Sequence, residues 1–200
     1  MNTATVKSYS PPPLNIREIC RYAGCKNDDA ALFELIGECL EEAERLLTYK
    51  VCYTVLPLEI QGDKLNLGFT ATESNGLKKC LDGCSSVLAF SATVGIGADR
   101  LIKKYSKISP AKALIMDALC TERIESVCDA FCADIRREYA NLSCSVTPRF
   151  SPGYGDLSLS IQPDILSATD ALKNIGITLS DSLLMIPTKS VTAIIGIKTA

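Results

Sequence analysis

A helical pattern that runs from Pro110 to about Tyr139 restricts the folds open to this chain more than any other segment does. Ser109 is a typical N-cap residue, and proline suits the first helical position because its missing N–H costs no hydrogen bond there. In the C-terminal half of the pattern, apolar residues recur at helical spacing and form one stripe: Ile124, Cys128, Phe131 and Ile135. The sequence therefore predicts one long helix with a single apolar stripe.

The segments on either side alternate between helical and strand-like patterns. Apolar residues at helical spacing, with caps such as Asn15 and Gly24, predict helices at 15–24, from Asp28 or Asp29 to 47, and at 77–81, 98–105 and 162–173. Runs rich in β-forming residues predict strands at 51–58, 64–69, 86–93, 143–150, 183–186 and 191–197. Because these elements are not in strict βαβ alternation, we expect an α+β fold in which flanking helices cover a largely antiparallel, twisted sheet.

The sequence also suggests a division along the chain. Residues 1–13 are polar and small and end in Pro11-Pro12-Pro13, which favours extended polyproline geometry, so we expect a flexible arm there. Residues 14–50 are predicted to form an N-terminal helical segment, and residues 51–200 the α+β core. A chain of 200 residues is long enough for one well-buried domain.

Charge and hydropathy exclude several classes of partner. The formal net charge is −2, and the lysines and arginines are scattered, so nothing attracts a nucleic-acid backbone. No charged-then-apolar leader opens the sequence, and no apolar run approaches the roughly 20 residues that a membrane span needs. We therefore expect a cytoplasmic protein that binds neither nucleic acid nor membrane.

The chain has ten cysteines and no histidine. Cysteines in predicted helices behave as small hydrophobes in a reducing compartment. Cys80 and Cys84, and also Cys128 and Cys132, stand one helical turn apart and could chelate zinc if further ligands converged. A cysteine-based metal or redox protein is therefore a minor alternative. Without histidine, the chain lacks the commonest general base, which disfavours hydrolytic chemistry.

Two glycine-containing segments invite a ligand-binding interpretation. Thr93-Val94-Gly95-Ile96-Gly97 joins a predicted strand to a helix, but Arg100 stands where the dinucleotide fingerprint needs a third glycine, so a tight turn is favoured. The segment from Thr147 to Asp156 is more distinctive. Arg149 offers a planar donor fork for a carboxylate, Pro152 and Gly153 form a turn, and Tyr154 could stack on a base. A buried arginine ion pair beside a tyrosine remains the structural alternative. Glu125, on the long helix, could be a simple salt-bridge partner, or it could meet an amino group or ribose hydroxyls.

A resemblance adds to this. Arg149-x-x-x-Gly153-Tyr154, followed by Met185-Ile186-Pro187-x-x-Ser190-Val191, resembles the activation domain of cobalamin-dependent methionine synthase, above all in its stand-alone bacterial form. The stretch from Glu125 to Asp129 also fits, and the resemblance covers about Val51 to Ile197. It implies a C-shaped α+β domain that binds S-adenosylmethionine in a shallow groove. Of the segments above, the resemblance assigns ligand contacts to Arg149, Phe150 through its main chain, Gly153, Tyr154 and Glu125.

The resemblance also implies a function. Such a domain reactivates cob(II)alamin carried by a cobalamin-binding methyltransferase module: a flavodoxin-like protein supplies one electron, and S-adenosylmethionine supplies the methyl group. Positioning is then the protein's task, which suits a chain without histidine. The alternative is a non-catalytic module that docks on a corrinoid protein to protect or load its cofactor. Two contacts of the family have no counterpart in this sequence: an acidic residue near the N-terminus and a second tyrosine on a later strand.

Overall fold

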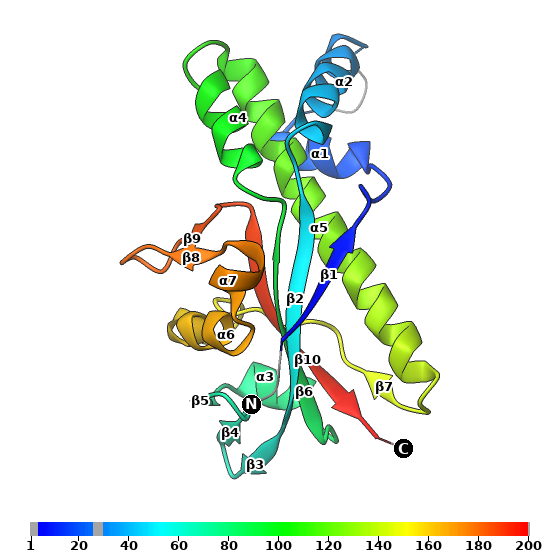
Figure 1. Ribbon diagram of the computed structural model, residues 1–200, viewed down its shortest axis with the longest axis vertical. Coiled ribbons are helices and arrows are strands. Elements are labelled where there is room, and N and C mark those ends of the chain that lie inside the picture. The colour runs from blue at the N-terminus through cyan, green and yellow to red at the C-terminus, as the bar shows by residue number, and fades with distance from the viewer. Residues whose placement is uncertain (1–3, 26–29, 200) are drawn as a thin grey trace.

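A five-stranded, wholly antiparallel sheet forms the centre of the computed structural model, which describes residues 4–25 and 30–199. The strands follow the order β1 (Thr5–Tyr9), β2 (Tyr49–Pro57), β6 (Ser86–Thr93), β10 (Ser190–Lys198) and β7 (Ser145–Val146). Helices cover both faces of this curled sheet (Figure 1). The predicted α+β class with a largely antiparallel sheet is confirmed.

The central strand β6 is buried on both faces, which explains its nearly continuous run of small and apolar residues. Side chains alternate across a strand, so Leu88 and Phe90 enter the core on one face while Val87 and Ala89 enter the core on the other. The neighbouring strand β10 divides in the same way between the two cores. Hydrophobic residues are therefore required at nearly every position of these strands, and the alternation typical of a half-exposed strand is absent.

The long helix α5 (Pro110–Ala140) packs on one face of the sheet and forms the larger core with it. Phe131 of α5 lies 4.9 Å from the Phe90 ring and 5.3 Å from the Tyr53 ring, measured between centroids. Three further helices gather at the N-terminal half of α5 (Figure 1): α1 (Ile16–Ala23), α2 (Ala30–Glu44) and α4 (Gly97–Tyr105). The stripe predicted from Ile124 to Ile135 is buried in this core.

The second face is covered by shorter elements. A buried hydrogen bond of 2.9 Å joins the Ser91 hydroxyl of β6 to the Thr169 hydroxyl at the end of α6. The largely apolar packing of α6 on the sheet therefore includes a buried polar contact between these two residues. The elements on this side are the helix α3 (Asn75–Cys80), the 3₁₀ turn η1 (Leu159–Ile161), α6 (Gln162–Ala168), α7 (Ala171–Ile175), the small sheet β3 (Glu59–Gln61), β4 (Lys64–Asn66) and β5 (Ala71–Glu73), and the hairpin β8 (Thr178–Leu179) and β9 (Met185–Ile186).

Most predicted helices agree with the structure at their ends. The Asn15 side chain accepts a hydrogen bond from the Glu18 N–H, and Gly24 ends α1 in the left-handed conformation, as expected of an N-cap and a C-cap. The predicted start of the second helix at Asp28 or Asp29 lies outside the described residues. The single helix predicted at 162–173 is wrong, because Asp170 has a φ of 48° and separates α6 from α7.

The flexible arm predicted for residues 1–13 is wrong where the structure describes it. Residues 5–9 form β1 and pair with β2. The prolines that follow are held by Arg123 of α5, which donates to the carbonyls of Pro12 and Pro13 at 2.7 and 3.1 Å. The local composition contains no signal for this anchor, because the anchoring residue lies far away in the sequence. The predicted boundary between residues 14–50 and 51–200 stays a prediction.

A buried ion pair supports this anchor. Arg123 is 1% exposed and its carboxylate partner Glu122 is 2% exposed, with Nε and Oε2 2.6 Å apart. Glu122 also accepts hydrogen bonds from the main-chain N–H of Asn15 at 3.0 Å and from the Ser126 hydroxyl at 2.7 Å. Because each charge is paired and further hydrogen-bonded, the pair fastens the N-terminal segment to the middle of α5.

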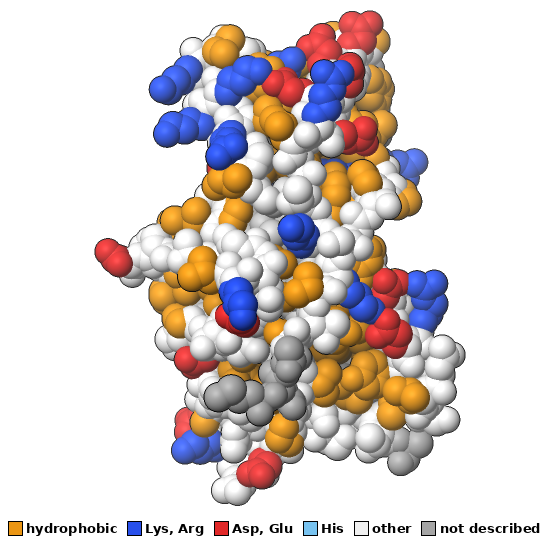
Figure 2. Space-filling view, in the orientation of Figure 1, with side chains coloured by type: hydrophobic (Ala, Val, Ile, Leu, Met, Phe, Trp, Pro, Cys, Tyr) orange, Lys and Arg blue, Asp and Glu red, His pale blue; other side chains and the backbone are white. Residues whose placement is uncertain are grey.

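Charged side chains of opposite sign separate at the helical end of the molecule. Lysine and arginine side chains gather over α4, whereas aspartate and glutamate gather over α2 (Figure 2). Ion pairs join the two helices and the start of α5: Lys104 pairs with Glu42, and Lys112 pairs with Glu38. Within residues 4–25 and 30–199, no helix is long and apolar enough to span a bilayer.

We predict that Arg123→Ala lowers the free energy of unfolding by about 3–5 kcal/mol, because Glu122 would remain buried without its cation. Urea unfolding followed by circular dichroism measures this loss. Arg137→Ala on the same helix is the matched control, since the Arg137 side chain is exposed and its pair with the half-buried Asp134 is worth less than about 1 kcal/mol. Equal losses in the two variants would contradict the assigned role of the buried pair.

Candidate functional site

A groove of about 770 Å³ opens between the loop after β7, helix α5, the β8–β9 hairpin and the start of β10. This volume lies in the range of small-molecule sites. Most of its wall is apolar or weakly polar, and among the described residues only Glu125 and Arg149 add a charge to its lining. The lining residues are Glu125, Arg149, Ser151, Pro152, Tyr154, Leu159, Gln162, Ser182, Leu183, Leu184, Met185, Thr188, Ser190, Val191 and Thr192.

The loop that carries Arg149 is attached to the edge of β10. Thr147 bonds to Gly196 through both its main-chain N–H and its hydroxyl, at 2.9 and 2.8 Å. Phe150 and Ile194 exchange main-chain hydrogen bonds of 2.8 and 2.9 Å and form an isolated bridge. The strand predicted at 143–150 is therefore wrong in extent. Regular pairing covers Ser145–Val146, and Pro148, which has no N–H to donate, separates the contacts of Thr147 from those of Phe150.

The turn after Phe150 is fixed by its own hydrogen bonds. Gly153 has a φ of 84°, which favours glycine, and its N–H donates to the Leu157 carbonyl at 2.8 Å. The Tyr154 N–H donates to the Ser151 carbonyl at 3.1 Å. The predicted turn at Pro152 and Gly153 is thus present, and it fixes the backbone position from which the Tyr154 side chain extends.

Asp156 attaches the far end of this loop to α3. Its carboxylate accepts hydrogen bonds from the Ser74 hydroxyl and from the main-chain N–H groups of Asn75 and Gly76, the last two at 2.6 and 3.1 Å. The Ser74 hydroxyl and then these N–H groups hold the pKa of Asp156 below its usual value. The motif is therefore anchored at both ends, on β10 and on α3.

The two aromatic residues of the motif have different positions. The Phe150 ring packs against the smaller core, whereas the Tyr154 side chain is 70% exposed and lines the groove. Their rings meet edge to face, with centroids 5.4 Å apart. Both main-chain groups of Phe150 bond to Ile194, so only the second lone pair of its carbonyl remains for another partner. Tyr154 is the aromatic face available to a ligand in this part of the groove.

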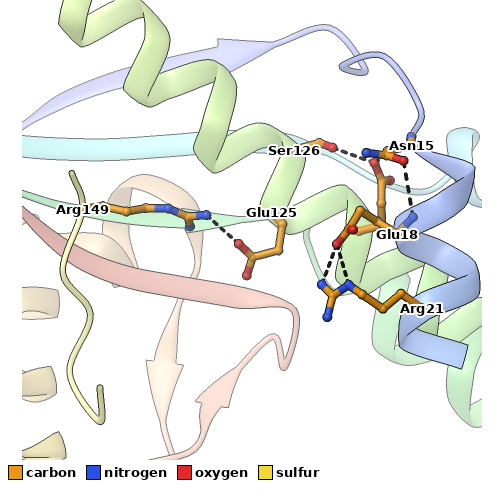
Figure 3. A network of polar contacts seen from close by, with 7 residues as sticks. Asn15, Glu18, Arg21, Glu125, Ser126 and Arg149 are labelled. Carbon is orange, nitrogen blue, oxygen red and sulfur yellow. Dashed lines mark hydrogen bonds and ion pairs between the residues drawn. The ribbon is translucent and has the colours of Figure 1, made fainter. Parts of the chain in front are cut away.

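Arg149 reaches across the groove to α5 (Figure 3). Its Nη2 atom donates to Glu125 Oε2 at 2.7 Å and to Asp129 Oδ1 at 3.1 Å. Burial lowers the pKa of Arg149, but the carboxylates of Glu125 and Asp129 raise it by more, so the guanidinium stays charged. The structure thus brings together Arg149 and Glu125, which the sequence placed 24 residues apart. It adds Asp129, which lies one helical turn beyond Glu125 and so on the same face of α5.

The opposite wall is fixed by contacts to α4 and α5. The Thr188 N–H and hydroxyl both donate to the Asp99 carboxylate at the start of α4, and Lys189 pairs with Asp117 at 2.8 Å. The Ser190 hydroxyl donates to the Pro187 carbonyl at 2.7 Å. Of the segment from Pro187 to Val191, which in the sequence is only a family resemblance, Thr188, Ser190 and Val191 line the groove.

A second cavity of about 360 Å³ shares Glu125 with the groove. It lies between α1 and α5 and is lined by Asn15, Glu18, Tyr22, Glu122, Glu125, Ser126 and Asp129. Sequence reasoning did not place any N-terminal residue near the site. The only available signal was the N-cap at Asn15, since the approach of α1 to α5 depends on the buried Arg123 contacts.

Among the described residues, no cysteine and no glycine of the turn at 93–97 lines the groove. Burial raises the pKa of the Cys128 and Cys132 thiols, so both remain protonated at neutral pH. No cluster of three or more metal-ligating side chains occurs in the part of the chain that the structure describes. Gly97 belongs to the tight turn favoured above: a Cβ there would lie 2.4 Å from the Leu46 carbonyl oxygen.

The architecture is that of a mixed domain in which helices cover a curled antiparallel sheet. Among solved structures, it is similar to the crystal structure of the MetH reactivation domain bound to AdoHcy, with a TM-score of 0.73 over 98% of this chain and 78% of that chain. The sequences are 16% identical, so the similarity concerns the fold. No protein-family model matches this sequence, and no curated protein matches it.

We predict that the contribution of Asp156 to stability depends on pH. Its folded-state pKa is lowered, so the stabilisation is present above its unfolded pKa of about 4 and is lost as the pH falls through the folded value. The difference in unfolding free energy between wild type and Asp156→Asn should therefore be largest near neutral pH and shrink as the pH falls below about 4. Urea titrations at several pH values measure it, with Asp181→Asn as an exposed control. A difference that does not change with pH would refute the assignment.

Proposed function

We propose that this chain binds S-adenosylmethionine in the groove and supplies its methyl group when an inactive corrinoid methyltransferase, such as cobalamin-dependent methionine synthase, is reactivated. The observation that carries this proposal is the Arg149–Glu125 pair in the wall of a groove of ligand size, beside the exposed ring of Tyr154. The similarity of the fold to a reactivation domain crystallised with AdoHcy supports it.

The chemistry of the groove matches the parts of this ligand. The planar guanidinium of Arg149 suits the carboxylate of the amino-acid end, and Glu125 suits its ammonium group. The exposed face of Tyr154 can stack on the adenine ring. Gly153 places this ring by fixing the turn, and the free lone pair of the Phe150 carbonyl can accept a hydrogen bond. Glu125 would then exchange part of its bond to Arg149 for the ligand's ammonium.

The reaction assigned to the complex needs positioning more than acid–base catalysis. In the proposed reaction, one electron from a flavodoxin-like donor would reduce cob(II)alamin on a partner protein to cob(I)alamin. The reduced cobalt would then attack the methyl carbon of S-adenosylmethionine: a cobalt–carbon bond would form, the carbon–sulfur bond would break, and S-adenosylhomocysteine would leave with the electron pair of that bond. No proton moves in this transfer, which is consistent with a chain that has no histidine. The residues of this chain bind the donor and orient its sulfonium.

The rim of the groove favours a large partner. Tyr154, Leu184 and Leu159 are 70%, 67% and 48% exposed, and all three line the groove. Exposed apolar side chains at the mouth of a site are typical of a surface that another molecule covers. The same rim also suits the alternative function, a non-catalytic module that docks on a corrinoid protein to protect or load its cofactor. We also propose that the protein carries out this function in the cytoplasm.

Arg149→Ala should weaken S-adenosylmethionine binding at least about tenfold, because charge-assisted hydrogen bonds contribute about 1.5–3 kcal/mol. Isothermal titration calorimetry on the purified chain measures the affinity. Arg100→Ala, an exposed position on α4, is the control and should bind as wild type does. If the wild type gives no heat at millimolar ligand, or if Arg149→Ala binds equally well, the proposed site is wrong.

Methyl transfer distinguishes the two functions. With a cob(II)alamin-loaded corrinoid protein, a one-electron reductant and methyl-labelled S-adenosylmethionine, we expect label in methylcobalamin only when this chain is present. Arg149→Ala should reduce the yield under subsaturating donor. Stable complex formation without any labelled methylcobalamin would instead support the docking module.

A further inference from the structure

We propose that Asp129 makes this site select a ligand of net positive charge, so that it binds S-adenosylmethionine more tightly than the demethylated product. This inference rests on the function proposed above and adds to it a specificity-determining residue. Asp129 does not line the groove; it acts on the ligand through space and through the guanidinium of Arg149.

The geometry places two carboxylates on one cation. A single nitrogen of Arg149 donates to both Glu125, at 2.7 Å, and Asp129, at 3.1 Å. Glu125 and Arg149 line the groove, whereas Asp129 lines two smaller cavities beyond it, one with Arg149 and one with Glu125. Asp129 therefore holds the guanidinium from the side that faces away from the groove. The three groups together carry one negative charge in excess.

The surrounding charges do not remove this excess. Glu18 is paired with Arg21, and Glu122 is paired with the buried Arg123, so these four groups cancel. Arg136 lines a small cavity with Asp129 and Arg149, but among the described residues no ion pair joins Arg136 to either carboxylate. The groove itself has no other charged lining residue among those described. The field at the amino-acid end of the groove is accordingly negative.

This field distinguishes donor from product by charge. At neutral pH, S-adenosylmethionine carries a carboxylate, an ammonium and a sulfonium, and its net charge is +1. Loss of the methyl group removes the sulfonium charge, and the product is a neutral zwitterion. A site with one excess negative charge attracts the cationic S-adenosylmethionine but has little net electrostatic attraction for the neutral product. The product therefore dissociates more readily. Without Asp129, Arg149 and Glu125 would form a neutral pair that treats both ligands alike.

Calorimetric affinities of wild type and Asp129→Asn for three ligands test this inference. The ligands are S-adenosylmethionine, S-adenosylhomocysteine and an analogue in which a carbon atom bearing a primary ammonium replaces the methylated sulfur. In Asp129→Asn, the preference for each cationic ligand over S-adenosylhomocysteine should fall by about threefold at low ionic strength, since exposed charges interact weakly. The wild-type preference should itself decline as salt is added. Asp129→Glu, which retains a carboxylate, should show the wild-type preference for cationic ligands. Glu138→Gln, which removes a carboxylate of α5 paired with Lys7, should leave this preference unchanged.

Each outcome distinguishes charge selection by Asp129 from a purely positioning role and from no role in the site. If Asp129→Asn weakens all three ligands equally, Asp129 only positions Arg149, and the charge inference is wrong. If all affinities are unchanged, Asp129 has no role in the site. If neither S-adenosylmethionine nor S-adenosylhomocysteine binds the wild type, the proposed function is wrong, and this inference fails with it. A selective loss for the two cationic ligands supports it.

Discussion

The packing of α5 against the central strands is the contact on which the other parts of this molecule depend. Phe131 and its neighbours fill the larger core against β6 and β10, and the same helix holds the N-terminal segment through Glu122 and Arg123. One turn further on, Glu125 faces the groove and meets Arg149. Residues of the core and residues of the groove therefore alternate along one helix. A support of this kind keeps the Glu125 carboxylate in place without a ligand.

The loop opposite α5 obtains its shape from several weak constraints. Phe150 is bonded to β10, Asp156 to α3, and the turn at Gly153 closes between them. None of these contacts is strong alone, but together they leave Arg149 and Tyr154 pointing into the groove from a backbone fixed on both sides. Because the loop is already ordered, ligand binding costs less conformational entropy of the chain. An irregular segment can thus present binding groups as reproducibly as a helix does.

The proposed function assigns electrostatic and positional tasks to the chain, and the structure contains the means for both. Arg149 is kept charged and oriented by two carboxylates, and the groove remains open, with exposed apolar residues at its rim. An enclosed pocket would exclude a second macromolecule from the reacting methyl group. An open groove admits one, and the partner then completes the exclusion of water.

Much of the fold follows from local patterns in the sequence. Helical periodicity, continuous apolar runs and capping residues predict α5, the doubly buried β6 and the caps of α1. The residue types of Arg149, Tyr154 and Glu125 also make them candidates for the site. The position of Asp129 beside Arg149, the pairing of β1 in place of a loose arm and the division of a predicted helix at Asp170 are visible only in the folded chain. Those features depend on partners distant in sequence or on single backbone conformations, and neither leaves a periodic pattern in the chain.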